Sequence, residues 1–255
     1  MKTLGAIIVA SGHGSLREVS GGAFPKVLES VHGRPIIARI LGTVTRSKLS
    51  PVVVVNPRFE LEVRMCLHSH GFSNIRYAIQ PERQGAADAV YRALPILENL
   101  GISDTMGIYA DMPFWEPDTI QAIVSHHRTF EPTLTMATLN LSERSPAGFT
   151  RFGRVIRKDG RIQRGVEYKD ATLEEQTCRV LNPCLWAWKT DWLGSRIPQL
   201  KPHEKGDGYP PELYLPDLIQ VASDEGYRIV EVPLKEDREA FGINTHQDLV
   251  EAQYL

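Results

Sequence analysis

The chain has 255 residues, of which 42% are hydrophobic and 24% charged, and its formal net charge is -2. These values are ordinary for a globular protein. They exclude a disordered chain, a fibrous repeat and the strongly basic surface that attracts nucleic acid. The longest apolar stretches are strand-sized, which excludes a membrane-spanning helix, and the first residues lack a signal-peptide pattern. Three cysteines form no even set, so we expect a reducing, cytoplasmic compartment.

The first part of the chain, to about residue 140, alternates between strand-like and helix-like patterns. Short apolar runs predict strands, and longer stretches with apolar residues every three or four positions predict helices between them. This alternation is typical of repeated βαβ units with a parallel sheet. The predicted strands cover residues 4–10, 52–56, 75–79, 106–110 and 133–139, and the predicted helices cover residues 36–44, 60–70, 86–97 and 116–128.

The pattern changes after residue 142. Short β-like pieces up to residue 185 are separated by turn signals such as Lys158-Asp159-Gly160, which predicts hairpins that form a small β-rich lobe. We then expect a loop over residues 198–211, a helix over 213–223, a strand over 227–232 and a helix over 246–254. The whole chain is therefore expected to form one α/β domain, with a ligand cleft at the carboxyl ends of its parallel strands.

A glycine-containing loop follows the first predicted strand directly, with the sequence Ser11-Gly12-His13-Gly14-Ser15. Two glycines let the backbone approach an anion and turn its N–H groups toward it. A dinucleotide fingerprint would require a third glycine where Arg17 stands, and a P-loop would require Gly-Lys-Ser/Thr, so both of these sites are disfavoured. A plain tight turn and a triphosphate loop with Arg17 and Lys26 as its cations remain as alternatives.

Two histidine pairs, His68/His70 and His126/His127, raise the question of a metal site. Each pair lies at a predicted polar helix end, without cysteine or carboxylate company. We therefore expect these side chains to lie on the solvated surface rather than to bind a metal.

Several sequence blocks occur in an order that is typical of one family. They are the loop at residues 11–15, Pro25-Lys26-Val27-Leu28, Gln80 with Gln84-Gly85-Ala86, Tyr109-Ala110-Asp111-Met112-Pro113, Phe152-Gly153-Arg154-Val155, Val166-Glu167-Tyr168-Lys169-Asp170-Ala171-Thr172 and Gly242-Ile243-Asn244. Together they make the chain resemble, over nearly its whole length, the uridylyltransferase half of bacterial N-acetylglucosamine-1-phosphate uridyltransferase. The block at residues 166–172 is the most specific of them.

The resemblance implies a sugar-1-phosphate nucleotidyltransferase that lacks the acetyltransferase β-helix. Its fold would be α/β, with a Rossmann-like, mostly parallel sheet flanked by helices, as in the nucleotide-diphospho-sugar transferases, and a small β-rich sugar-binding lobe. Within a single domain over residues 1–255, the nucleotide-binding part would cover about 1–140, the sugar-binding lobe about 141–212 and a closing helix–strand–helix 213–255.

The resemblance also implies roles for individual residues. The nucleotide would be bound by Ala10, Ser11, Gly12, Gly14, Lys26, Gln80, Gly85 and Ala86, and the sugar by Tyr109, Gly153, Glu167 and Asn182. Catalysis would depend on Lys26, Arg17 and Asp111, and Mg²⁺ would be held by Asp111 and Asn244. Taken singly, Asp111 could instead be a helix N-cap and Asn244 a turn former, but their occurrence together in family order favours the metal site.

Two segments depart from the family pattern. The family places Thr-Arg directly after the second loop glycine, whereas Ser15-Leu16 precede Arg17 here. Asn182 is followed by Pro183-Cys184 instead of Thr-Gly, which changes the backbone freedom beside the sugar. Phosphate and sugar binding are therefore where we expect this chain to differ from the family.

The reaction implied by the resemblance joins a nucleoside triphosphate to a sugar-1-phosphate and releases pyrophosphate. The expected substrates are UTP and N-acetylglucosamine-1-phosphate or a related hexose phosphate. CTP, dTTP and GTP stay open because Gln80-Pro81-Glu82-Arg83 differs from the commonest form. The alternative is a non-catalytic nucleotide-sugar-binding or regulatory protein on the same fold. We expect neither nucleic acid nor membrane as a partner, and a homo-oligomer stays open.

Overall fold

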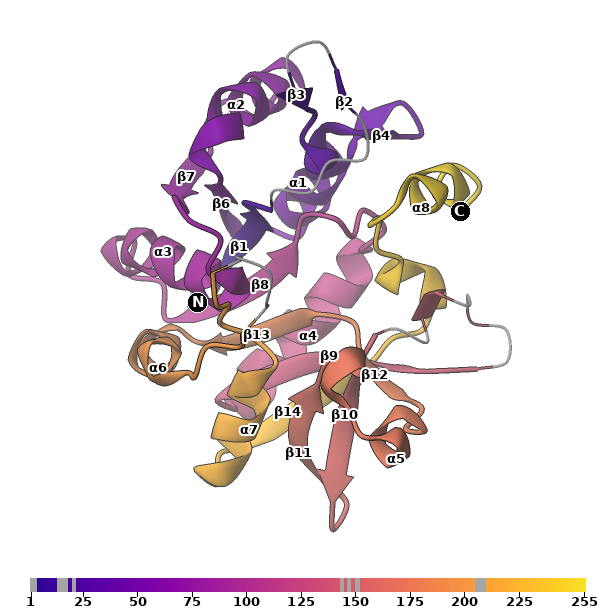
Figure 1. Ribbon diagram of the computed structural model, residues 1–255. Helices are drawn as coiled ribbons and strands as arrows, with labels where there is room; N and C mark the ends of the chain where they lie inside the picture. Colours follow the sequence, from indigo (N-terminus) through magenta and orange to yellow (C-terminus); the bar gives the residue numbers. More distant parts are fainter. Residues whose placement is uncertain are drawn as a thin grey trace.

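A computed structural model describes residues 4–12, 18–19, 22–142, 145, 148–149, 152–204 and 210–255. Strand β1 (Leu4–Ala10) lies between β6 (Ser50–Val55) and β8 (Asp104–Tyr109) and pairs with both in parallel (Figure 1). The next strand, β7 (Arg76–Ile79), pairs in parallel with β6. The parallel sheet predicted from the alternating pattern is therefore confirmed in this part of the molecule.

Helices cover both faces of this sheet (Figure 1). On β1, Ile8 packs with Val53 into one core, whereas Ile7 packs with Val54 into the other. The first core is covered by α1 (Ile36–Arg46), α2 (Glu60–Ser69) and α4 (Pro117–Phe130), and the second by α3 (Gly85–Asn99), α6 (Thr190–Arg196) and α7 (Asp217–Asp224). Because both faces are buried, the middle of the sheet favours continuous apolar runs, which explains the uninterrupted valines of β6.

Beyond β8 the sheet becomes mixed. Strand β13 (Leu185–Lys189) lies antiparallel between β8 and β9 (Leu134–Asn140), and β14 (Ile229–Pro233) pairs in parallel with β9. The edge is built by the antiparallel strands β12 (Val180–Asn182), β10 (Gly153–Lys158) and β11 (Arg161–Val166). The turn sequence at residues 158–160 predicted the β10–β11 hairpin. In the described part of the chain these strands extend the main sheet to ten strands and do not form a separate sheet.

Strand β13 and helix α6 were not predicted from the sequence. Trp186 and Trp188 of β13 point into one core, and Leu185 and Ala187 point into the other. All four side chains are buried, so the strand shows no alternation of polar and apolar residues. Its place in the middle of the sheet explains why the usual signal of a half-buried strand is missing.

The remaining elements are short. Two small antiparallel ladders join β2 (Glu18–Val19) to β3 (Gly22–Ala23) and β4 (Ser30–Val31) to β5 (Arg34–Pro35). Single 3₁₀ turns are η1 (Lys26–Leu28), η2 (Pro57–Phe59), η4 (Tyr168–Asp170), η5 (Ile197–Gln199) and η6 (Asp237–Ala240), and the short helices are α5 (Leu173–Gln176) and α8 (His246–Glu251).

The helix predicted from residue 213 begins later, at α7 (Asp217–Asp224). The backbone of Leu213 is instead used for contacts with the start of α3: its N–H donates to Gln84 O at 2.8 Å, and its carbonyl accepts from the Ala87 N–H at 3.1 Å. Residues 213–216 therefore belong to a loop that is held against another helix, a tertiary contact that the local pattern cannot reveal.

The surface position predicted for the histidine pairs is wrong for His127, whose side chain is 1% exposed. Its Nδ1 forms a hydrogen bond of 2.8 Å with Thr135 Oγ1, and its Nε2 lies 3.3 Å from Asp104 Oδ1, so the buried ring has polar neighbours inside the fold. His68 and His70 are exposed, as predicted. Among the described residues, no helix has the length and apolar character needed to span a membrane.

Candidate active site

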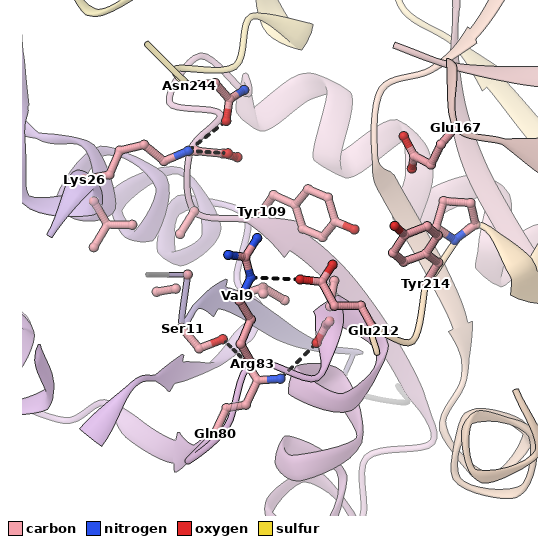
Figure 2. A pocket seen from close by; sticks show the side chains of 18 of the residues that line it. Val9, Ser11, Lys26, Gln80, Arg83, Tyr109, Glu167, Glu212, Tyr214 and Asn244 are labelled. Carbon is pink, nitrogen blue, oxygen red and sulfur yellow. Dashed lines mark hydrogen bonds and ion pairs between the residues drawn. The ribbon is translucent and has the colours of Figure 1, made fainter. Parts of the chain in front are cut away.

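A cleft of about 790 Å³ opens at the carboxyl edge of the parallel strands. Residues just beyond β1, β7 and β8 line it, together with residues that follow β11 and residues from the loop before α7. Figure 2 shows Lys26 and Asn244 on one side of the cleft and Glu167 and Tyr214 on the other. The predicted residues that line the cleft are Ala10, Ser11, Gly12, Lys26, Gln80, Gly85, Ala86, Tyr109, Asp111, Glu167 and Asn244.

The end of β1 begins the glycine-containing loop. Ala10 and Ser11 are buried and Gly12 is exposed, and all three line the cleft. A Cβ added to Gly12 would meet nothing within 4 Å, so this glycine leaves room for a ligand to approach the backbone. The predicted residues Gly14 and Arg17 lie outside the described part of the chain.

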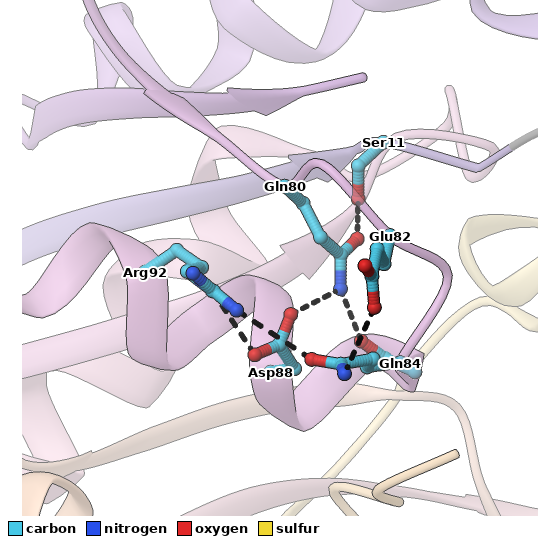
Figure 3. Close-up of polar contacts among 7 residues, drawn as sticks. Ser11, Gln80, Glu82, Gln84, Asp88 and Arg92 are labelled. Atoms are coloured by element: carbon cyan, nitrogen blue, oxygen red, sulfur yellow. Dashed lines mark hydrogen bonds and ion pairs between the residues drawn. The ribbon is translucent and has the colours of Figure 1, made fainter. Parts of the chain in front are cut away.

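The Gln80 side chain is held by three residues (Figure 3). Its carbonyl oxygen accepts a hydrogen bond from the Ser11 hydroxyl, and its amide nitrogen donates to Gly85 O at 2.9 Å and to Asp88 Oδ2 at 2.8 Å. Arg92 Nε in turn donates to Asp88 Oδ1 at 3.1 Å. Both amide hydrogens of Gln80 are thus used inside the protein, and the network fixes Ser11 and Gly85 relative to one another.

Gly85 is a glycine for a steric reason. Its φ of +88° lies in the left-handed region, and a Cβ placed there would come within 2.4 Å of Leu213 O. No side chain fits such a contact with backbone. The first turn of α3, which includes Ala86, can therefore approach both the cleft and the loop before α7.

Lys26, Asp111 and Asn244 converge from three distant segments. Lys26 Nζ donates to Asp111 Oδ2 and to Asn244 Oδ1, each at 2.9 Å. Lys26 is presented by the η1 turn, in which Leu28 N–H donates to Pro25 O at 3.0 Å. The structure thus brings together the predicted catalytic lysine and both predicted metal ligands.

Backbone contacts hold the two oxygen-bearing residues side by side. The Ile243 N–H donates to Asp111 O at 2.9 Å, which fixes Asn244 next to Asp111. The Asn244 N–H donates to Asp248 Oδ2 at 2.8 Å, and Asp248 forms a capping box with Thr245 at the start of α8. The terminal helix therefore serves as the anchor of Asn244.

The opposite wall combines aromatic and charged side chains. Tyr109 packs edge-on against Trp186, with ring centroids 5.7 Å apart. Burial, reinforced by Cys184 and the Glu167 and Asp111 carboxylates, raises the pKa of the Tyr109 hydroxyl well above its usual value. Tyr109 is therefore a neutral hydroxyl that can both donate and accept a hydrogen bond.

Two predicted sugar-binding residues, Gly153 and Asn182, do not line the cleft. They pair directly between β10 and β12, and the Asn182 side chain is 1% exposed. Asn182 Oδ1 accepts from the Cys184 N–H at 3.1 Å. A Cβ on Gly153 would lie 3.1 Å from Val166 O, so this glycine lets the strand that leads to Glu167 come close.

The departure at Pro183-Cys184 has a clear backbone consequence. Cys184 has a φ of +61°, a left-handed conformation that glycine adopts at lower cost. The chain thus keeps the same kind of turn that a glycine would make, with a thiol added beside Glu167 and Asp111. Burial, followed by those two carboxylates, raises the pKa of the Cys184 thiol well above its usual value, so the thiol stays protonated.

Four polar side chains of the cleft were not predicted from the sequence: Arg83, Lys169, Glu212 and Tyr214. Arg83 Nε donates to Glu212 Oε1 at 2.8 Å, and Lys169 Nζ donates to the Tyr214 hydroxyl at 2.9 Å. Lys169 lies inside the block at residues 166–172 and could have been found there. Tyr214 lies in the segment that was predicted to be a helix, and Glu212 lies between that segment and the predicted loop, at the end of the expected sugar-binding lobe, so neither residue was singled out.

The open sheet, with a cation-bearing cleft at the carboxyl edge of its parallel strands, is typical of nucleotide-binding α/β proteins. Residues 6–196 match the family model described as the MobA-like NTP transferase domain, and the chain belongs to this family. It is a family of nucleotidyltransferases.

Curated relatives of the chain include bifunctional proteins named GlmU. The protein from Geotalea uraniireducens is 32% identical over 257 residues, which cover 100% of this chain and 53% of the relative. The protein from Burkholderia multivorans is 30% identical over 250 residues, which cover 98% of this chain and 51% of the relative. The chain thus spans about half the length of the curated relatives it matches.

Two solved structures share the fold. A Bacillus anthracis protein described as a glucose-1-phosphate thymidylyltransferase, in complex with sucrose, has a TM-score of 0.75 at 17% identity, covering 99% of this chain and 94% of that one. The 4-diphosphocytidyl-2C-methyl-D-erythritol synthase from Anaerococcus prevotii has a TM-score of 0.66 at 15% identity, covering 99% and 97%. The predicted fold class, that of the nucleotide-diphospho-sugar transferases, is confirmed.

Proposed function

We propose that the protein is a sugar-1-phosphate nucleotidyltransferase. An oxygen of the sugar phosphate attacks the α-phosphorus of a nucleoside triphosphate, the bond between the α-phosphorus and the bridging oxygen breaks, and pyrophosphate leaves. The observation that supports this most directly is the convergence of Lys26, Asp111 and Asn244 in one cleft. UTP is the favoured nucleotide and N-acetylglucosamine-1-phosphate or a related hexose phosphate the favoured acceptor, by resemblance to the uridyltransferase family.

In this proposal Lys26 stabilises negative charge that develops on the α-phosphate. The attacking phosphate is already ionised at neutral pH, so the reaction needs no general base, and catalysis rests on position and charge. A lysine held by a short 3₁₀ turn suits this task because its ammonium is a compact point charge on a flexible stem. Arg17 is proposed as a second cation for the phosphates.

Asp111 and Asn244 fit a divalent cation by the chemistry of their oxygens. Both already accept hydrogen bonds from one cationic group, the Lys26 ammonium. The described residues contain no cluster of three or more His, Cys, Asp or Glu side chains, so an all-protein cage is not available among them. That suits Mg²⁺, which keeps waters and takes ligands from substrate phosphates. When bound, Mg²⁺ would supply charge stabilisation at the phosphates.

The wall around Ser11 and Gly85 is proposed to bind the nucleoside. Ala10, Gly12 and Ala86 offer backbone groups at the cleft surface, and Gln80 keeps them in place through its internal hydrogen bonds. A base whose edge offers both a donor and an acceptor would be selected by such fixed groups, because a wrong base leaves them unsatisfied.

The wall around Tyr109 and Glu167 is proposed to bind the sugar. Glu167 would accept hydrogen bonds from sugar hydroxyls, and the neutral Tyr109 hydroxyl would donate or accept. Gly153 and Asn182 would act from behind this wall, Gly153 by allowing the approach of Val166 and Asn182 by holding the turn at Cys184. Tyr214 and Lys169 would complete the wall.

Pyrophosphate release tests the proposal. The wild-type protein is assayed with Mg²⁺ against UTP, CTP, dTTP and GTP, each with a panel of hexose and N-acetylhexosamine 1-phosphates. We expect turnover with at least one pair. Tight binding of a nucleotide sugar without turnover on any pair would contradict the enzyme and favour a nucleotide-sugar-binding protein on the same fold.

A further inference from the structure

The Lys26 ammonium lies between two oxygens that belong to segments far apart in the sequence (Figure 2). It is 2.9 Å from Asp111 Oδ2 and 2.9 Å from Asn244 Oδ1. A carboxylate oxygen and an amide oxygen are also ligands that Mg²⁺ accepts. The lysine therefore uses the same two oxygen atoms that the proposed function assigns to a metal ion.

The backbone of the two oxygen-bearing residues is held by contacts that do not involve Lys26. Asp111 and Ile243 are joined by a backbone hydrogen bond of 2.9 Å, and the Asn244 N–H is held by Asp248 at 2.8 Å. Lys26, by contrast, reaches them with a four-carbon side chain that can swing without moving the backbone. The backbone that carries the two oxygens is the fixed part of this arrangement, and the ammonium, on its long side chain, is the movable part.

Charge decides whether both cations can be present together. Lys26 and a divalent ion would place three positive charges against the single negative charge of Asp111. Repulsion at a few ångströms inside a half-buried cleft opposes such a state strongly. A triphosphate adds about four negative charges, so its arrival gives the ammonium a new partner within reach.

We infer that Asp111 and Asn244 form one cation site that Lys26 and the metal ion use in turn. Lys26 fills the site before substrate binds and moves to the phosphates when the nucleotide arrives with its metal ion. The inference rests on the proposed function. Its consequence is that the metal ion binds weakly by itself and tightly only with the nucleotide. Lys26 thus prevents other cations from binding to the two oxygens in the absence of substrate, and it makes metal binding depend on nucleotide binding.

The experiment measures Mn²⁺ binding without nucleotide, by the loss of the electron paramagnetic resonance signal of the free ion. We expect Lys26→Met to bind Mn²⁺ at least about tenfold more tightly than wild type, because a unit charge has been removed from beside the ion. The double variant Lys26→Met/Asp111→Asn should lose this gain. Equal Mn²⁺ affinity of the wild type and Lys26→Met would overturn the inference.

Lys169→Met is the matched control, because it removes a cation from the same cleft. Lys169 bonds to the Tyr214 hydroxyl at 2.9 Å and to neither metal-ligand oxygen. It should therefore leave Mn²⁺ affinity within about twofold of wild type. A gain as large as that of Lys26→Met would mean that only the total charge of the cleft matters, which contradicts a shared site.

Thermal unfolding gives a second measure and checks that the variants fold. Added Mn²⁺ should raise the Tm of Lys26→Met more than that of wild type, because at a given concentration a ligand that binds more tightly stabilises the folded state more. If Lys26→Met does not fold, the same Mn²⁺ titration is made with Lys26→Gln, which also removes the positive charge. A wild-type protein that turns over substrate but binds Mn²⁺ as tightly as Lys26→Met would refute this inference alone. Absence of turnover would refute the proposed function and leave the Mn²⁺ titration interpretable.

Discussion

An aspartate–lysine pair lies at each end of β8. Just beyond its carboxyl end, Lys26 Nζ donates to Asp111 Oδ2 at 2.9 Å, and at its amino end Lys189 Nζ lies 2.9 Å from Asp104 Oδ1. The two pairs have the same chemistry and the same separation. They differ in their surroundings: the Asp104 side chain is 8% exposed and that of Asp111 is 23% exposed.

Asp104 is surrounded by polar groups of the fold itself. Ser103 Oγ donates to its Oδ2 at 2.8 Å, and His127 Nε2 lies 3.3 Å from its Oδ1. Burial acts to raise the pKa of Asp104, but the contacts with His127, Lys189 and Ser103 outweigh it and hold that pKa well below its usual range. The pair at the amino end of β8, the far end from the cleft, therefore stabilises the fold. The pair at the carboxyl end, the cleft end, stays accessible to a ligand.

The largest expected difference between the two ends is in turnover. Asp111→Ala should reduce turnover by about 1,000-fold or more, because it removes a group that acts on the reacting phosphates. Its free energy of unfolding should change by less than about 1 kcal/mol, since the pair is partly exposed. The measurements are steady-state pyrophosphate release and urea unfolding.

Asp104→Asn is the matched variant at the far end. We expect its turnover to stay within about twofold of wild type and its free energy of unfolding to fall by about 3 kcal/mol, because Lys189 would be left beside a neutral partner. An equal loss of activity in Asp104→Asn and Asp111→Ala, at a temperature where both are folded, would contradict a purely structural role for Asp104.

Glycine-to-alanine substitutions at the cleft and away from it should also differ in their effect on the free energy of unfolding. Gly85 (φ +88°) and Gly71 (φ +86°) have nearly the same backbone conformation, but only Gly85 has backbone atoms within 4 Å of an added Cβ. We expect Gly71→Ala to cost about 1 kcal/mol from strain alone and Gly85→Ala about 3 kcal/mol, with weakened nucleotide binding. Equal losses for the two variants would show that Leu213 gives way to the new methyl group.

Acid should weaken the anchor at the far end. A carboxylate whose folded pKa is depressed stabilises the protein above its unfolded pKa of about 3.9, and this contribution is lost as the pH falls toward the folded pKa. The stability difference between wild type and Asp104→Asn should therefore shrink by about 1.3 kcal/mol between pH 6 and pH 3. Urea unfolding at both pH values measures it, and a difference that stays constant with pH would rule out this role of the Asp104 carboxylate.

Much of this architecture could be predicted from sequence because it depends on local patterns. Apolar runs predicted the parallel strands. The sequence blocks predicted, through the family resemblance, that Lys26, Asp111 and Asn244 share a site, and the structure brings these three side chains together. The far-end anchor could not be predicted, because Asp104, His127 and Lys189 meet only through the packing of β8, α4 and β13. For the same reason β13, whose side chains are buried on both faces, gave no alternating signal.

The smallest expected effect is on substrate KM and concerns Tyr214, which lines the cleft and also packs against residues of the surrounding fold. Its ring stacks on His203 with centroids 4.2 Å apart and planes at 10°, and His203 Nε2 lies 2.7 Å from Asp217 Oδ2. Tyr214→Phe removes only the hydroxyl that Lys169 contacts. If Tyr214 belongs to the sugar wall, this change should raise the KM for the sugar phosphate about threefold, which corresponds to the loss of a partly exposed hydrogen bond of about 0.6 kcal/mol.

His203→Ala should have an effect of the same sign, because the Tyr214 ring would lose its stacking partner while its hydroxyl is kept. The KM for the triphosphate should stay within about twofold in both variants, since the groups proposed to bind the nucleoside lie on the opposite wall. Kinetics with each substrate varied in turn make the comparison. If only the KM for the triphosphate rose, Tyr214 would instead belong to the wall that binds the nucleoside. That wall is close in the chain, because the neighbouring residue Leu213 contacts the start of α3.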